Sequence, residues 1–194
     1  DLMSITWKLT PGIKWSDGSA LTAHDVVFTG QYCMDPAGGC AQSNKLADVS
    51  NIEALDDLTV KVSFSVAKPF PYGPFVGAEQ PIIQKAQFAD CMGAKAPECT
   101  AENFGPIGTG PFVVTDFKAN DVISMEANPH YRDASKPAFA SVTFKGGGDA
   151  AAAARSVLET GEFDYAWNLQ IDPTILSQMA EGGKGEVISS FGTA

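Results

Sequence analysis

Residues 104–112, FGPIGTGPF, divide the sequence into two parts with different patterns of apolar residues. Three glycines and two prolines in nine residues favour a linker or hinge, because both residue types interrupt helices and strands. The part that follows alternates predicted strands and helices in the order β-β-β-α-β-α-β, which is typical of an α/β fold. The sequence therefore predicts a mixed α/β (α+β) chain with a linker or hinge at 104–112, and its length allows one large domain or two small ones.

The first part begins with a strand, a turn and a helix. Alternating apolar and polar residues predict a half-buried strand over residues 4–9. The turn WSDG then leads into a predicted helix at about 23–33. Two further alternating runs, 49–55 and 58–65, predict a hairpin.

The second part contains signals for five strands and two helices. Asp149 and Asp172 are predicted N-caps of the helices, each of which ends at a glycine. The predicted strands lie at 112–117, 121–127, 139–145, 162–167 and 185–191.

The net charge of the chain argues against some classes of binding partner. There are 13 basic and 23 acidic residues, a net charge of −10, and no cluster of Lys or Arg. Such a chain repels a phosphate backbone, so we expect no nucleic-acid partner. No apolar run approaches the roughly 20 residues that a membrane-spanning helix needs.

The four cysteines form two close pairs in the sequence, Cys33 with Cys40 and Cys91 with Cys99. Four cysteines allow three pairings, and the Pro- and Gly-containing loops between them favour a disulfide within each pair. Disulfides imply an oxidising compartment. A zinc site is one alternative, although its ligands usually have the closer spacing C-x₂₋₄-C. Four reduced thiols are another.

The turn WSDG at 15–18 and the nearby His24 bring an indole, a carboxylate and an imidazole together, as in the corner of an active site. A structural role explains them better. Thr22 and Asp25 have the spacing of a capping box, and the helix dipole disfavours a charged imidazole in the first turn. We therefore expect Trp15 to pack the turn against the helix.

Neither histidine belongs to a recognisable catalytic or metal-binding motif. His24 and His130 lack Cys, Asp or Glu at metal-ligand spacing, and G-x-S-x-G and H-E-x-x-H are absent from the sequence. The glycine run before Asp149 lacks the Lys and Ser or Thr of a phosphate-binding loop. The sequence thus predicts no catalytic residue, metal or cofactor. A secreted hydrolase is the alternative from another functional class.

The segment EFDYAWNLQ, residues 162–170, is a candidate for ligand binding. Its three aromatic residues share one face of the predicted strand, and Asn168 and Gln170 follow the carboxyl end of that strand. Ligands of α/β proteins bind outside the carboxyl ends of strands, and an indole beside amides suits a peptide or a sugar. A core aromatic strand with a polar exit is an equal alternative.

Four motifs, in the same order along the chain, resemble the solute-binding proteins of peptide/nickel-type (family 5) ABC importers. ITWKLTPGIKWSDGSALTAHDVVFTG is similar to that family's strand, aromatic-x-Asp-Gly turn and helix. IEALDDLTVKVSFSVAKPFP resembles its hairpin, and IGTGPFVVTDFKANDVISMEANPHY resembles its Gly-Thr-Gly-Pro stretch and the hairpin that ends in Asn-Pro-x-Tyr. ARSVLETGEFDYAWNL resembles its unit of a helix, Gly-Glu and a strand.

The resemblance implies part of a type II periplasmic-binding-protein-like fold, in which two lobes close over a solute. Residues 1–105 would form the small subdomain of the first lobe, with the two Cys loops, and residues 106–194 part of the main sheet of that lobe. Members of the family are much longer. We therefore expect this chain to be a fragment without the opposite lobe.

The resemblance also implies a function without catalysis. A periplasmic or extracytoplasmic monomer would capture oligopeptides and deliver them to ABC permease subunits. Nickel or haem, opines and oligosaccharides are the alternative solutes. The implied ligand contacts, which would face the cleft from the ends of strands, are Trp167, Asn168, Leu169, Gln170 and, more weakly, Phe191 and Gly192.

Overall fold

The computed structural model describes residues 2–77, 80–146, 148–167 and 169–189. The chain divides into two compact units, Asp1–Phe144 and Lys145–Ala194, and each is described by itself. No described helix is both long and apolar enough to cross a membrane. The domain boundary expected after residue 105 concerns the lobes of a longer protein and stays a prediction.

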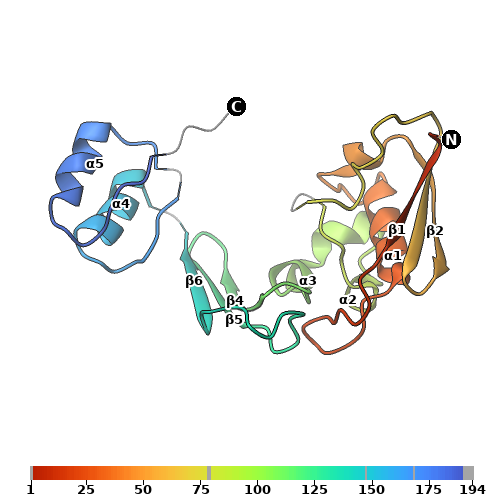
Figure 1. Cartoon of the computed structure of the whole chain (residues 1–194), viewed down its shortest axis with the longest axis horizontal. Coiled ribbons are helices and arrows are strands. Elements are labelled where there is room, and N and C mark those ends of the chain that lie inside the picture. The colour runs from red at the N-terminus through yellow and green to blue at the C-terminus, as the bar shows by residue number, and fades with distance from the viewer. Residues whose placement is uncertain (1, 78–79, 147, 168, 190–194) are drawn as a thin grey trace. The chain divides into compact units, whose positions relative to one another are not determined.

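The first unit contains a three-stranded antiparallel sheet in the order β1-β3-β2, of which Figure 1 labels β1 and β2. Its strands are β1 (Ser4–Lys8), β2 (Val49–Asp56) and β3 (Thr59–Phe64). β2 and β3 form the predicted hairpin, while β1 pairs with β3 and places Trp7 opposite Val60. Buried and half-buried residues alternate along β3, because successive side chains of a strand point to opposite faces of the sheet.

Helix α1 (Ala23–Met34) packs against the buried face of this sheet and confirms the predicted helix. Val26 of α1 lies in a core with the buried side chains of β2 and β3. Another side of α1 carries Phe28, which packs with Phe88 of the short helix α2 (Lys85–Phe88). The helix is therefore held between the sheet and α2.

Two loops of the first unit are closed by disulfides. Cys33 bonds to Cys40 and Cys91 bonds to Cys99, with Cα–Cα distances of 5.0 and 5.9 Å. These bonds confirm the predicted pairing. The short helical elements around the loops are η1 (Ser43–Leu46), η2 (Gly93–Glu98) and α3 (Thr100–Phe104).

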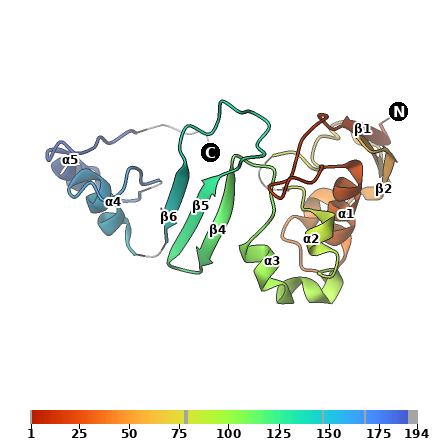
Figure 2. The same cartoon turned by 90° about the horizontal axis from the view of Figure 1, so that it is seen from below.

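The second sheet of this unit has three strands in the order β4-β5-β6, which lie side by side in Figure 2. They are β4 (Phe112–Lys118), β5 (Val122–Ala127) and β6 (Ser141–Lys145). β4 and β5 form the second predicted hairpin. At its tip Asn120 has a φ of 60°, a left-handed conformation that Asn tolerates better than most residues.

The Gly- and Pro-rich segment 104–112, a predicted linker or hinge, is hydrogen-bonded to the rest of the unit. The backbone N–H of Ser16 donates to the carbonyl oxygen of Gly108 at 2.9 Å. The N–H of Ile107 donates to Oε1 of Gln87 at 2.8 Å. The glycines and prolines thus mark a fixed connection between the α2–α3 region and the second sheet.

The second unit contains two helices, α4 (Ala150–Leu158) and α5 (Pro173–Ala180). They pack around a small core formed by Ala154, Leu158 and Met179. The helix faces that form this core are apolar, and the other faces of both helices are mostly exposed.

The N-caps predicted for these helices are confirmed. The side chain of Asp149 accepts a hydrogen bond from the N–H of Ala152 at 2.8 Å. The side chain of Asp172 accepts from the N–H of Thr174 at 2.8 Å, and this bond lowers the pKa of Asp172. Both carboxylates satisfy backbone donors that a helix leaves unpaired at its start.

The two strands predicted in the second unit are wrong for its described residues. Residues 162–167 and 185–189 have no strand pairing, and residues 190 and 191 lie outside the described part. An extended segment is unstable as a strand without a hydrogen-bonded neighbour. The N–H groups of Glu162 and Phe163 bond instead to the carbonyl oxygen of Ser156.

Candidate functional site

The turn WSDG, residues 15–18, is tied to the segment before α2. One carboxylate oxygen of Asp17 accepts from the N–H and hydroxyl of Ser19 at 2.9 and 2.6 Å. The other accepts from Nε2 of Gln84 at 2.8 Å. These bonds, from Ser19 first and then from Gln84, lower the pKa of Asp17. Trp15 is buried, as a packing role requires, and its predicted packing against the helix stays a prediction.

Asp25 joins the start of α1 to the start of α2. Its Oδ2 accepts from the N–H of Thr22 at 2.9 Å within a capping box, and its Oδ1 accepts from the N–H of Lys85 at 2.9 Å. One helical turn later, Oγ1 of Thr29 accepts from the N–H of Ile83 at 3.0 Å. Asp25 and Thr29 are both buried, so their hydrogen bonds hold α1 and residues 83–85 in a fixed position.

The two imidazoles lie in different surroundings. Nε2 of His24 is 3.8 Å from Oδ1 of Asp57, and both side chains are largely exposed. His130 lies against Gly18 of the WSDG turn, where an added Cβ would be 3.2 Å from its Nε2. The turn therefore contacts the NPHY segment, and the motif connects structural elements. No contact described here gives either imidazole a hydroxyl partner of the kind that nucleophilic catalysis needs.

Cys91, Cys99 and Glu102 place possible metal ligands within 4.8 Å of one another. The two sulfur atoms are bonded to each other. Because the thiolate is the form of cysteine that binds metals, the disulfide removes both sulfur ligands. The cluster closes a loop and is not assigned as a metal site.

A hollow of about 390 Å³ opens beside the starts of α1 and α2. Its lining includes Ala20, Ala86 and Ala89, together with Trp15, whose buried Nε1 has no partner among the described residues. Small-molecule sites need several polar groups that converge on the ligand. Asp25 also lines the hollow, but both of its oxygens already accept hydrogen bonds. The lining side chains of Ser19, Thr22 and Gln84 are also hydrogen-bonded within the protein. The hollow is therefore not assigned as a solute site.

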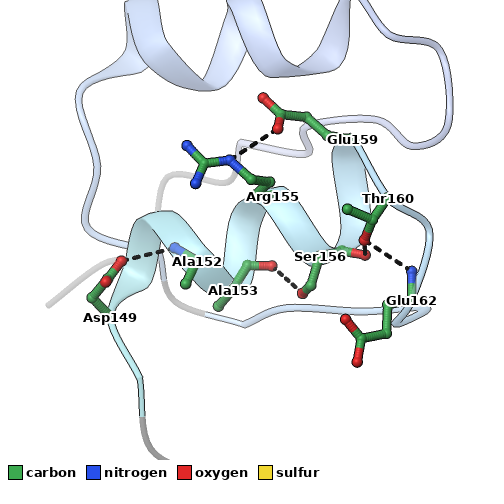
Figure 3. A network of polar contacts seen from close by, with 8 residues as sticks. All are labelled: Asp149, Ala152, Ala153, Arg155, Ser156, Glu159, Thr160 and Glu162. Atoms are coloured by element: carbon green, nitrogen blue, oxygen red, sulfur yellow. Dashed lines mark hydrogen bonds and ion pairs between the residues drawn. The ribbon is translucent and has the colours of Figure 1, made fainter.

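The segment that follows α4, described at residues 162–167 and 169–170, begins at a fixed point at the end of that helix (Figure 3). The carbonyl oxygen of Ser156 accepts from the N–H groups of Glu162 at 2.8 Å and Phe163 at 3.2 Å. It also accepts from Oγ1 of Thr160 at 3.1 Å, and that oxygen accepts in turn from the N–H of Glu162 at 3.3 Å. These bonds fix the direction in which the segment leaves the helix.

The other end of the segment is held by apolar packing. Leu169 and Ile171 pack against the core of the second unit. Between the two fixed ends, the side chains of Tyr165 and Trp167 are 74% and 78% exposed. Large aromatic side chains dominate the energetics of binding surfaces, so this exposed pair makes the segment the strongest candidate for ligand contact in the second unit.

The structure places the sequence-predicted contacts in three groups. Trp167 and Gln170 are exposed on the segment. Leu169 is half-buried against the core, so its side chain is committed to packing. The other three candidates, Asn168, Phe191 and Gly192, lie outside the described residues.

Sequence reasoning missed the residues that fix this segment. Thr160 and the carbonyl group of Ser156 position it, and neither was singled out as functional. The available signal was the Gly at position 161, directly after Thr160, which marks the end of a helix. A Thr hydroxyl at that point can satisfy a free carbonyl group of the last turn.

Comparisons with known proteins identify the family. A sequence profile described as "Bacterial extracellular solute-binding proteins, family 5 Middle" matches residues 1–192. The glutathione-binding protein GsiB of Pectobacterium atrosepticum is 28% identical over 172 residues, which are 89% of this chain and 32% of that protein.

The solved structures that are similar to this chain include the following two. The ABC transporter substrate-binding protein CtaP from Listeria monocytogenes has a TM-score of 0.78 and 29% identity, over 94% of this chain and 36% of that one. The oligopeptide-binding protein AppA from Bacillus subtilis, solved with a nonapeptide, has a TM-score of 0.74 and 27% identity, over 84% and 32%. These matches confirm the predicted type II periplasmic-binding-protein-like fold, in part, and this chain spans about a third of each relative's length. The chain belongs to the bacterial extracellular solute-binding proteins of family 5.

Proposed function

We propose that the natural protein carrying this chain is the solute-binding component of an ABC importer and captures oligopeptides. The family match over residues 1–192 is the observation that carries this proposal. The relatives described above include a glutathione-binding and an oligopeptide-binding protein, which supports peptides as the solute class. A protein in this role binds its solute reversibly and does not transform it, so we propose no enzymatic activity.

Trp167 and Gln170 are the proposed ligand contacts on the segment that follows α4. An exposed indole offers a broad apolar face to a peptide side chain. The Gln170 amide offers both a donor and an acceptor, which matches the two hydrogen-bonding groups of a peptide unit. Because the Leu169 side chain packs against the core, we propose that Leu169 contributes only through its backbone. Asn168, Phe191 and Gly192 remain proposed contacts, although they lie outside the described residues.

We further propose that the protein acts outside the cytoplasm and delivers its solute, as a monomer, to permease subunits in the membrane. The two disulfides support this location, since such bonds persist in oxidising compartments. The net charge of −10 also opposes adsorption to anionic lipid. Nickel or haem, opines and oligosaccharides remain the alternative solutes, and a secreted hydrolase remains the alternative of another class.

A thermal-shift screen of the full natural protein, freed of co-purified ligand, tests the proposal. The panel contains di- to hexapeptides, nickel, haem, an opine and an oligosaccharide at equal concentrations. A ligand at 100 times its Kd stabilises the folded protein by about 2.7 kcal/mol, which raises the Tm measurably. We expect a shift with peptides and none with the other solutes. A shift with another solute and none with peptides would contradict the proposal.

A further inference from the structure

The sequence on either side of the segment that follows α4 is acidic. Residues 155–184 carry two basic and five acidic side chains, a net charge of −3. Both basic side chains have partners within the unit. Nε of Arg155 donates to Oε2 of Glu159 at 2.9 Å (Figure 3), and Nζ of Lys184 donates to the carbonyl oxygen of Thr160 at 3.2 Å. These two cations are therefore engaged at the end of α4, where the segment begins.

Two carboxylates of the segment itself have no such partner. Glu162 and Asp164 are exposed, and neither takes part in an ion pair among the described residues. Asp164 directly precedes the exposed Tyr165, and Glu162 and the exposed Trp167 lie within three residues of that position. Lys184 keeps its positive charge, because the Thr160 carbonyl group is neutral. The segment thus presents two electron-rich rings beside two carboxylates, in a stretch whose net charge is −3.

We propose that residues 162–167 bind a positively charged side chain of the peptide, a lysine or an arginine. This inference rests on the proposed function and adds the chemical class of the substrate. A cation over the face of Trp or Tyr is attracted by the ring quadrupole. The carboxylates of Glu162 and Asp164 add an attraction that both aromatic faces share.

The spacing of these residues makes the two attractions act on one ligand group. Consecutive Cα atoms are 3.8 Å apart, and three residues of extended chain span at most about 10 Å. The Cα atom of Asp164 therefore lies within about 10 Å of the Cα atom of Trp167, which is on the order of the Debye length of about 8 Å at physiological ionic strength. A ligand cation on the aromatic pair is within the field of the carboxylates, whereas an acidic side chain would be repelled from the same surface.

Isothermal titration of the full natural protein, freed of bound ligand, tests this inference. The probes are tripeptides of alanine in which each position in turn is lysine, norleucine or glutamate. Norleucine has the apolar stem of lysine without its charge, so the ratio of the two dissociation constants isolates the cation. At one position we expect the lysine peptide to bind roughly 5- to 30-fold more tightly than the norleucine peptide, and the glutamate peptide to bind most weakly.

Substitutions test whether residues 162–167 cause the preference for the lysine peptide. Trp167→Leu and Asp164→Asn are each expected to lower the lysine-to-norleucine ratio by at least half, and added salt is expected to lower it in the wild type. Phe139→Leu removes an exposed aromatic ring from the first unit, and Asp57→Asn removes an exposed carboxylate from the same unit, outside the stretch 155–184. Both controls should leave the ratio unchanged. Far-UV circular dichroism checks that each variant is folded.

The outcomes separate this inference from the proposed function. Peptide binding with a lysine-to-norleucine ratio below about 2 at every position would overturn the cation preference and leave peptide capture standing. A ratio that persists in both segment variants would place the preference elsewhere and overturn the assignment to residues 162–167. No binding of any peptide would reject the proposed function, and this inference with it.

Discussion

Replacing Asp25 by alanine is expected to destabilise the first unit where α1 meets the segment before α2. The side chain is 6% exposed and accepts two hydrogen bonds of 2.9 Å, from the N–H groups of Thr22 and Lys85. A hydrogen bond to a charged group contributes about 1.5–3 kcal/mol, so the pair contributes about 3–6 kcal/mol. Because the hollow beside Asp25 can admit water to the freed N–H groups, we expect a loss of about 3–4 kcal/mol.

Asparagine at position 25 keeps one acceptor and is expected to lose about half of that free energy. Urea denaturation followed by circular dichroism measures the free energy of unfolding, and hydrogen exchange at the Lys85 amide reports the local bond. Asp57→Ala is the matched control, since it removes the same charge beside the same helix start from a side chain that is 84% exposed. A surface change of this kind is expected to stay within about 0.5 kcal/mol of the wild type.

Two results would refute the role assigned to Asp25. One is an Asp25→Ala variant whose free energy of unfolding lies within about 1 kcal/mol of the wild type, the range of ordinary substitutions. The other is unchanged exchange protection at the Lys85 amide. Either result would mean that the capping box and the bond to Lys85 add little to the packing of α1.

Three further changes test other parts of the structure. Replacing Cys91 and Cys99 by serine is expected to lower the free energy of unfolding by about 2–3 kcal/mol, as loop entropy gives for their separation of 8 residues, and denaturation with and without reductant checks it. Gly30→Ala places a Cβ 2.2 Å from Cδ1 of Ile52 and is expected to cost about 1–3 kcal/mol; in a double-mutant cycle, Ile52→Val should recover part of this loss. Since the folded-state pKa of Asp17 lies below its ordinary 3.8, its stabilisation is present above about pH 4 and is lost as the pH falls through the folded-state pKa. Asp17→Asn should flatten that part of a pH–stability curve.

Local patterns were sufficient to locate most of the helices and strands. The predicted helix at 23–33 is α1, Ala23–Met34, and the predicted hairpin is β2 and β3. Caps and alternation act over a few residues, so the sequence carries them directly. The caps at Asp149 and Asp172 were predictable for the same reason.

Features that depend on distant partners were not predictable from the same patterns. The alternation of aromatic and other residues in 162–167 fits a strand. A strand needs a hydrogen-bonded neighbour, however, and the local pattern carries no information about such a partner. The same pattern could not show that Tyr165 and Trp167 are exposed while Leu169 packs on the core. Segment 104–112 has the composition of a linker, and only the positions of Ser16 and Gln87 show that it is bonded in place.

The proposal of peptide capture is tested most directly by the ligand that the protein carries. Native mass spectrometry of the full natural protein, exported by its host and purified without denaturation, measures the mass of any bound molecule. Fragmentation of the released ligand then gives its chemistry. The account predicts that the bound molecules are a mixture of short peptides. It also predicts that these bound peptides contain a larger fraction of lysine and arginine than the free peptides of the same cell extract. A bound opine, sugar, haem or nickel complex in place of peptides would contradict it.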